Sequence, residues 1–169
     1  MSRVLRMTER PVVRHFSACE RIDRSPDEFH TTLSNVIHVI RPLPGHGYPR
    51  IHPELGLFAM LTNGRGMHTL TVELTVGVGP GAQQVYQTRS VTIDLGADPL
   101  MVHGFPIRLR NLPFPHPGQY ELVLLCDNEP LAHELIELRD SRCPPDDRPR
   151  DYETPVRVHP PSSWNSPTG

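Results

Sequence analysis

Hydrophobic and polar residues alternate with a period of two along most of this chain. The clearest example is MHTLTVELTVG, residues 67–77. Strict alternation of this kind predicts a β-strand with one buried and one exposed face. The side chains expected on the buried face are His68, Leu70, Val72, Leu74 and Val76.

The same pattern and its interruptions predict about eight strands and no long helix. Near the C-terminal end, the alternation places Tyr120, Leu122, Leu124 and Cys126 on one face, and DNEP at 127–130 predicts the turn of a final hairpin. NGRG at 63–66 predicts a tight turn that pairs 55–62 with 67–77 as a second antiparallel hairpin. The predicted strands are 11–22, 34–42, 55–62, 67–77, 84–95, 100–112, 120–126 and 131–139, with a break near Arg89.

Short strands joined by glycine and proline turns are typical of an antiparallel β-sandwich. Parallel strands would need crossover helices, and none is predicted. The fold class expected is therefore all-β, an antiparallel sandwich of the immunoglobulin-like or jelly-roll-like type.

Composition divides the chain into three parts. Residues 1–10 carry no pattern and are predicted to be a flexible N-terminus, with either Met1 or Met7 as the start. Residues 11–140 form the predicted sandwich domain. Residues 141–169 are rich in proline and show no period, so a disordered tail is expected there. Its Trp164, the one tryptophan of the chain, is either incidental or part of a short docking motif.

Charge and cysteine content narrow the function classes. All 17 basic residues are arginine, 19 residues are acidic, and the basic residues form no cluster, which disfavours nucleic-acid binding. No segment is apolar enough to span a membrane or to act as a secretory signal, so a cytoplasmic protein is expected. Cys19, Cys126 and Cys143 form no Cys-x-x-Cys pair, so a zinc ribbon is not expected. Buried free thiols are expected at Cys19 and Cys126, and a cross-sheet disulfide is the alternative.

Three segments together resemble a known family. They are ACERIDRS at 18–25, LGLFAMLTNGRGMHTLTVEL at 55–74, and RLRNLPFPHPGQYELVLLCDNEPLAHE at 108–134. The last one contains a Phe-Pro-x-Pro-Gly-x-Tyr stretch from Phe114 to Tyr120. In order and spacing these segments resemble an uncharacterised bacterial family of small β-sandwich proteins, a domain of unknown function. The resemblance implies the fold over most of 11–140, and it assigns no activity because the family has none assigned.

The segment RPLPGHGYPRIHPE, residues 41–54, holds the strongest candidate chemistry. Its prolines favour extended backbone, so it is predicted to cross from one sheet to the other. Two other interpretations stay open. His46, His52 and Glu54 offer metal ligands, although no His-x-His pair accompanies them. Arg41 and Arg50 suit an anion or carboxylate, with Tyr48 beside them for a small polar ligand.

Catalytic motifs are missing: the chain has no Gly-x-Ser-x-Gly elbow and no glycine-rich phosphate loop. The function expected is that of a non-enzymatic module acting through protein contacts, as an adaptor, assembly subunit or recognition module, with no cofactor. Sheet edges also allow a homodimer. The alternative is a metal-dependent jelly-roll enzyme or small-ligand binder that uses the 41–54 loop.

Overall fold

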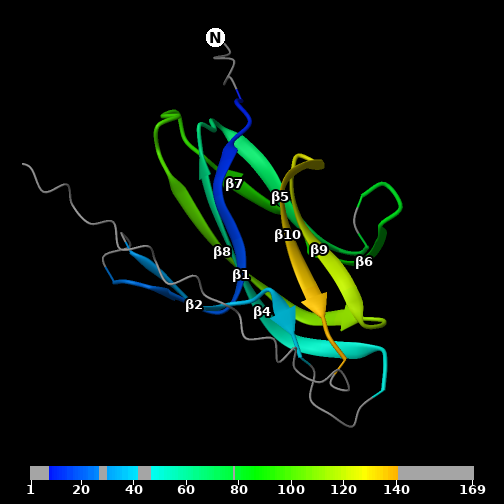
Figure 1. The fold of residues 1–169 in the computed structure, drawn as a ribbon. Coiled ribbons are helices and arrows are strands. Elements are labelled where there is room, and N and C mark those ends of the chain that lie inside the picture. Colours follow the sequence, from blue (N-terminus) through cyan, green and yellow to red (C-terminus); the bar gives the residue numbers. More distant parts are fainter. Residues whose placement is uncertain (1–7, 27–29, 42–46, 78, 141–169) are drawn as a thin grey trace, which may run out of the picture.

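A computed structural model describes residues 8–26, 30–41, 47–77 and 79–140 of the chain. These residues form ten strands and no helix, arranged in two sheets that pack face to face (Figure 1). The first sheet has the order β2-β1-β4-β8 and the second β3-β10-β9-β5-β6, with β7 also pairing with β5. The strands are β1 (Val12–Arg24), β2 (Thr31–Val36), β3 (Val39–Ile40), β4 (Arg50–Thr62), β5 (Met67–Val76), β6 (Gln83–Gln87), β7 (Val91–Asp94), β8 (His103–Phe114), β9 (Gly118–Cys126) and β10 (Glu129–Leu138).

The strand order is that of an immunoglobulin-like sandwich. In immunoglobulin lettering, β1, β4 and β8 correspond to strands A, B and E of one sheet. The second sheet then holds β5, β6, β9 and β10 as strands C, C′, F and G. The immunoglobulin-like alternative is therefore the correct one of the two that the sequence left open.

A tyrosine corner supports this assignment. At the start of β9 the hydroxyl of Tyr120 donates to the carbonyl oxygen of His116 at 2.5 Å and accepts from the His116 N–H at 3.2 Å. Immunoglobulin-like folds place such a tyrosine near the start of strand F, the equivalent of β9. The Phe-Pro-x-Pro-Gly-x-Tyr stretch is the loop that this hydroxyl holds in place.

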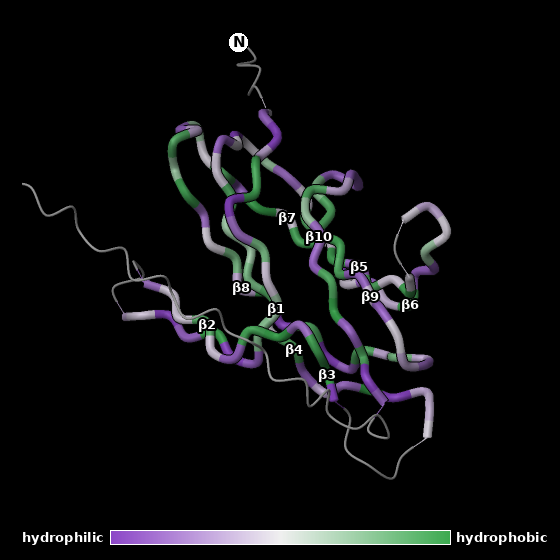
Figure 2. Tube along the Cα trace, in the orientation of Figure 1, coloured by the Kyte–Doolittle hydropathy of each residue, from purple (hydrophilic) through white to green (hydrophobic). Residues whose placement is uncertain are grey.

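The core lies between the sheets, where the alternation of the sequence places apolar side chains. The inward faces of β5 and β9 are as predicted, since Leu70, Val72 and Leu74 are buried and so are Tyr120 to Cys126 at alternate positions. Opposite them lie Leu55, Leu57, Ala59 and Leu61 of β4. Figure 2 shows hydrophobic stretches along β4 and hydrophilic residues in many of the outer loops.

The final hairpin is confirmed. β9 and β10 pair antiparallel, and Asp127 and Asn128 between them have φ angles of 53° and 68°. Positive φ at both central residues is the requirement of a type I′ hairpin turn. The predicted break near Arg89 is confirmed too, because β6 and β7 are separate strands along the same edge of β5.

The predicted hairpin of 55–62 with 67–77 is wrong. β4 pairs with β1 and β8 in the first sheet, whereas β5 pairs with β6, β7 and β9 in the second. Both strands direct apolar residues into the same core, so they pack face to face across it. Asn63 does adopt the positive φ that its sequence suggests, at 59°, but the turn carries the chain from one sheet to the other.

Ten strands replace the expected eight for two local reasons. The predicted strand 34–42 is divided between β2, which pairs with β1, and β3, which pairs in parallel with β10. The predicted strand 84–95 is divided into β6 and β7. Residues 141–169, including Cys143 and Trp164, and most of residues 1–10 lie outside the described residues, so the domain boundaries stay predictions.

Candidate functional site

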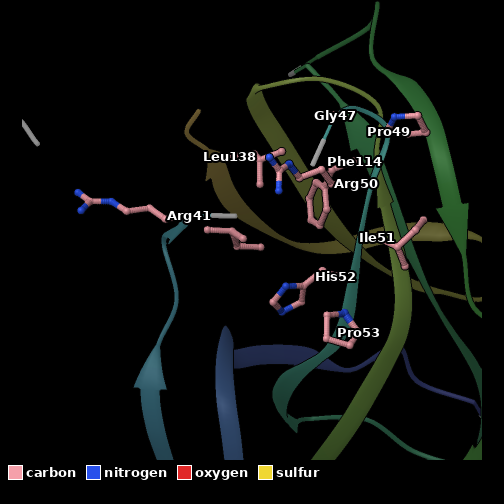
Figure 3. Close-up of a pocket in the computed structure, with 10 residues that line it drawn as sticks. Arg41, Gly47, Pro49, Arg50, Ile51, His52, Pro53, Phe114 and Leu138 are labelled. Atoms are coloured by element: carbon pink, nitrogen blue, oxygen red, sulfur yellow. The ribbon is translucent and has the colours of Figure 1, made fainter. Parts of the chain in front are cut away.

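A pocket of about 470 Å³ opens at one end of the sandwich, between the two sheets. β3 and β10 contribute Ile40 and Leu138, and β8 contributes Phe114, all three of them buried. Arg50, Ile51 and His52 are the first three residues of strand β4, and Arg41 comes from the segment after β3 (Figure 3). The other lining residues are Gly47, Pro49 and Pro53.

The predicted crossing of 41–54 between sheets is confirmed for its first part and corrected for the rest. Ile40 lies in the second sheet and Arg50 in the first, so the chain does cross between them. Residues 50–54, however, are strand residues that pair with β8, from Arg50 opposite Phe114 to Glu54 opposite Arg110. Pairing with β8 fixes the backbone under Arg50 and His52, which makes this side of the pocket rigid.

Two arginines and one histidine supply all the polar lining among the described residues. The guanidinium carbon of Arg50 lies 5.4 Å from the ring centroid of Tyr48, so the ring stacks against the charge. Figure 3 shows Arg50 and His52 directed toward the pocket and Ile51 directed away, while Arg41 extends outward at the rim. None of the described lining residues is acidic.

His52 contributes a hydrogen-bonding imidazole to this pocket. Burial lowers the pKa of His52 below its ordinary value, and a backbone hydrogen bond to Glu54 and the charge of Glu20 oppose this shift. Its ring meets the edge of the Phe114 ring at 79° with centroids 6.5 Å apart. Since desolvation disfavours the charged imidazole, the positive charge of the pocket at neutral pH comes mainly from the arginines.

Tyr48 stacks with Arg50 but does not line the pocket. Its ring packs against the core, and its hydroxyl is buried with no hydrogen-bond partner among the described residues. Of the three residues predicted to bind a ligand, Arg50 therefore faces the pocket, Arg41 lies at its rim, and Tyr48 stacks against Arg50.

Glu54 points away from the pocket. Along β4, His52 faces the pocket and Leu55 the core, so the residues between them reverse the alternation. The paired strand β8 shows the same change, because Leu109 and Leu112 are both buried and Asn111 between them has a φ of 54°. The Glu54 carboxylate instead pairs with Arg108 at 3.9 Å and with Arg110 at 3.5 Å.

The predicted metal ligands are therefore not brought together as a set. His52 lines the end pocket, Glu54 lines a separate depression of about 540 Å³, and His46 lies outside the described residues. Among the described residues, the group of three side chains close enough to share an ion is His68, Cys126 and Asp127. Sequence reasoning missed this group because His68 is 59 positions from Asp127 and each of the three resembles an ordinary core or turn residue.

The cysteines follow the first of the two expectations. Cys19 and Cys126 are free and buried, so they form no cross-sheet disulfide. Burial raises the pKa of both thiols, that of Cys126 to about 11, and the neighbouring Asp127 charge adds to the shift at Cys126. Neither thiol is therefore activated as a nucleophile.

A further titratable cluster lies where β1 approaches β10. Here His15 Nε2 and Ser17 Oγ are 2.8 Å apart, and His38 Nδ1 lies 3.7 Å from Glu134 Oε1. Within the described residues His15 has no carboxylate hydrogen bond of the kind that orients histidine in a serine triad. Burial raises the pKa of Glu134, while His38 and His15 oppose the shift.

Glu134→Gln is expected to stabilise the protein by up to about 1 kcal/mol at pH 7. The folded-state pKa of Glu134 lies above its ordinary value of 4.5. The stability that comes from the protonated carboxyl is therefore fully present below about pH 4.5. This contribution is lost as pH rises through the raised pKa, and glutamine keeps it at every pH. Urea unfolding at several pH values should show the gain vanish below about pH 4.5. An equal gain for the exposed Glu20→Gln control, or a gain independent of pH, would contradict the assignment.

No helix among the described residues is long and apolar enough to cross a membrane.

No curated protein shows significant similarity to this chain. The solved structures that resemble it include two with 13% sequence identity each. One is the Pseudomonas fluorescens alkylpurine DNA glycosylase AlkC bound to DNA containing an abasic site analog, with a TM-score of 0.44 over 76% of this chain and 30% of that protein. This chain therefore spans less than a third of the glycosylase.

The other is an immunoglobulin-like protein from Pseudomonas aeruginosa, with a TM-score of 0.37 over 78% of this chain and 98% of that one. Both TM-scores are below 0.5, so the fold assignment rests on the strand order and tyrosine corner of this chain.

A family model does match, over residues 23–139. These residues include the final hairpin, the tyrosine corner and the end pocket. The chain therefore belongs to the family of unknown function DUF6941.

Proposed function

We propose that this protein is a non-enzymatic recognition module whose end pocket binds a group that joins an apolar body to a carboxylate. The observation that carries the proposal is the combination of an apolar floor with an arginine rim. Ile40, Phe114 and Leu138 offer buried apolar surface. Arg50 lines the same pocket, and its guanidinium stacks on the ring of Tyr48.

Arginine suits this role because its planar fork donates two parallel hydrogen bonds to a carboxylate. Such a bond to a charged group contributes about 1.5–3 kcal/mol, and stacking on Tyr48 limits the freedom lost on binding. The described lining residues provide charge and apolar surface, and they include no serine, cysteine or carboxylate that could act as a nucleophile beside the His52 imidazole. Recognition is therefore the role that these side chains suit.

The carboxylate can come from a small molecule or from the C-terminus of a partner protein. The test uses 3-phenylpropanoate and N-acetyl-Leu-Phe, each compared with its uncharged amide, in NMR titrations of the full-length protein. We expect the carboxylates to bind with Kd values of about 1 mM or lower, and the amides to bind about tenfold or more weakly. Signals of residues 50–52, 114 and 138 should shift.

Arg50→Gln is expected to remove the preference for carboxylate over amide while the shifts at Phe114 and Leu138 persist weakly. Arg108→Gln, on the outer face, is the matched control and should change nothing. Equal binding of acid and amide to the native protein would refute the proposal. Tighter binding of the dipeptide than of 3-phenylpropanoate would assign the carboxylate to a protein partner, and the reverse order to a small molecule.

Contact with another protein is also part of the proposal. Leu100, Met101 and Val102 are consecutive, and 80%, 53% and 45% of their surfaces are exposed just before the edge strand β8. Exposed apolar residues beside an unpaired strand edge favour a protein partner or a homodimer.

The buried free thiols of Cys19 and Cys126 support a reducing, cytoplasmic location.

A further inference from the structure

His68, Cys126 and Asp127 meet at the end of the sandwich opposite the pocket (Figure 1). His68 lies at the start of β5, Cys126 ends β9, and Asp127 begins the turn to β10. One candidate ligand atom from each residue lies within 4.8 Å of the other two. This cluster is independent of the pocket and of the function proposed for it.

Backbone groups fix the orientation of His68. Its Nε2 lies 3.0 Å from the carbonyl oxygen of Glu9 and 3.0 Å from that of Arg65. Carbonyl oxygens only accept, so Nε2 carries a hydrogen and donates it. Nδ1 is thereby aimed at Asp127 Oδ2, at 2.7 Å. A histidine that binds a metal through one ring nitrogen commonly donates the other N–H to a backbone carbonyl in this way.

A hydrogen bond also orients the half-exposed side chain of Asp127. Its Oδ1 accepts the backbone N–H of Thr69 at 2.8 Å, which leaves Oδ2 directed at His68. Cys126 Sγ lies 3.9 Å from the same Oδ2. The side chain of His68 is 3% exposed and that of Asp127 52% exposed, so an ion would be reached from solvent past the carboxylate.

We propose that His68 Nδ1, Cys126 Sγ and Asp127 Oδ2 form a binding site for a divalent transition-metal ion, with zinc the best match. A nitrogen, a thiolate sulfur and a carboxylate oxygen are the donors that zinc takes in proteins, at about 2.0, 2.3 and 2.0–2.2 Å. Soft thiolate also excludes magnesium and calcium, which need oxygen ligands. Three protein ligands leave a fourth, tetrahedral position for water.

Binding requires one local adjustment. The ion replaces the proton shared by Nδ1 and Oδ2, and the thiol loses its proton to become a thiolate. The half-exposed Asp127 carboxylate turns to widen the gap, while His68 stays fixed by Glu9 and Arg65. The nearest arginines do not oppose the cation at close range, because Arg10 pairs with Glu129 at 2.7 Å and Arg65 with Glu9 at 3.2 Å.

Cobalt(II) titration of the full-length protein, purified in chelator, tests this site. One equivalent of cobalt should produce thiolate-to-cobalt charge-transfer absorption and the visible bands of tetrahedral cobalt, and zinc should displace it. Cys126→Ala should abolish the charge-transfer band. Cys19→Ala and Cys143→Ala are matched controls, and both should retain it.

Asp127→Asn provides a second variant that keeps the turn and the hydrogen bond from Thr69. We expect it to weaken zinc binding about 10–100-fold or more. His52→Ala, in the end pocket, should leave zinc affinity unchanged. Folding of each variant is checked by circular dichroism.

Three results would each overturn the proposal. They are a folded native protein without a charge-transfer band, a band that survives Cys126→Ala, and equal zinc affinity of Asp127→Asn and the native protein. If Cys126→Ala does not fold, the Asp127→Asn comparison alone decides. Loss of carboxylate binding at Arg50 leaves these results untouched, so the two proposals fail separately.

Discussion

Replacement of Tyr120 by alanine is expected to lower the free energy of unfolding by about 3–5 kcal/mol. Tyr120 is fully buried at the start of β9, and its ring meets the edge of Phe114 with centroids 4.8 Å apart at 84°. Alanine removes this aromatic contact and leaves a cavity between the sheets. Phe114 also forms the floor of the end pocket, so carboxylate binding should weaken along with stability.

Tyr120→Phe separates the hydroxyl from the ring. It keeps the packing and removes both hydrogen bonds to His116, which should cost about 1–3 kcal/mol. Urea unfolding followed by circular dichroism measures both variants. Tyr86→Phe on β6 is the matched control, because no hydrogen bond of that hydroxyl occurs among the described residues. If Tyr120→Phe were as stable as the native protein, the tyrosine corner would not hold the loop.

Gly64→Ala is expected to cost about 1–3 kcal/mol. Gly64 lies in the turn that carries the chain from β4 to β5. A methyl group there would overlap the side chain of Leu95, which is buried, and would lie 2.9 Å from Cβ of Pro11. The ring of Pro11 cannot rotate away, so either the N-terminal segment or the loop before β8 has to move.

Gly81→Ala supplies the control for this substitution. Nothing lies within 4 Å of the added methyl group there, so the substitution should be neutral or stabilise by up to about 1 kcal/mol. Thermal unfolding of both variants separates a steric cost at Gly64 from the general effect of replacing glycine. Equal stability of the two variants would argue against close packing of Pro11 and Leu95 around the turn.

The two candidate sites lie at opposite ends of the sandwich, and different features of the fold create them. The pocket exists because β3 and β10 meet the start of β4 at one end, beside Phe114. The His68 cluster exists because β5 and β9 are neighbours, with Leu70 opposite Cys126 and the backbone N–H of Asp127 bonded to the carbonyl oxygen of Thr69. Each site therefore depends on a pairing between strands that are distant in sequence.

Local sequence determined the strands and their buried faces. Local sequence predicts the inward positions of β5 and β9 and the turn at Asp127, because strand periodicity and positive φ depend on a few neighbouring residues. The change of sheet between Ile40 and Arg50 could be predicted for the same reason, since proline favours extended backbone in the residue before it. The sequence therefore determined the β-sandwich class, the last hairpin and the general position of the 41–54 segment.

Tertiary structure decided which strands pair and which side chains meet. An apolar strand beside a tight turn fits a hairpin or a change of sheet equally well, and only the shared core assigned β4 and β5 to different sheets. The reversal of alternation near Asn111 separated Glu54 from His52, an effect of the paired strand that spacing in β4 does not reveal. His68 and Asp127 are 59 positions apart, and they meet because hydrophobic burial aligns β5 with β9. Long-range packing of this kind depends on the whole core, which is why the sequence could indicate Arg41, Arg50 and His52 in the pocket but not the meeting of His68 with Asp127.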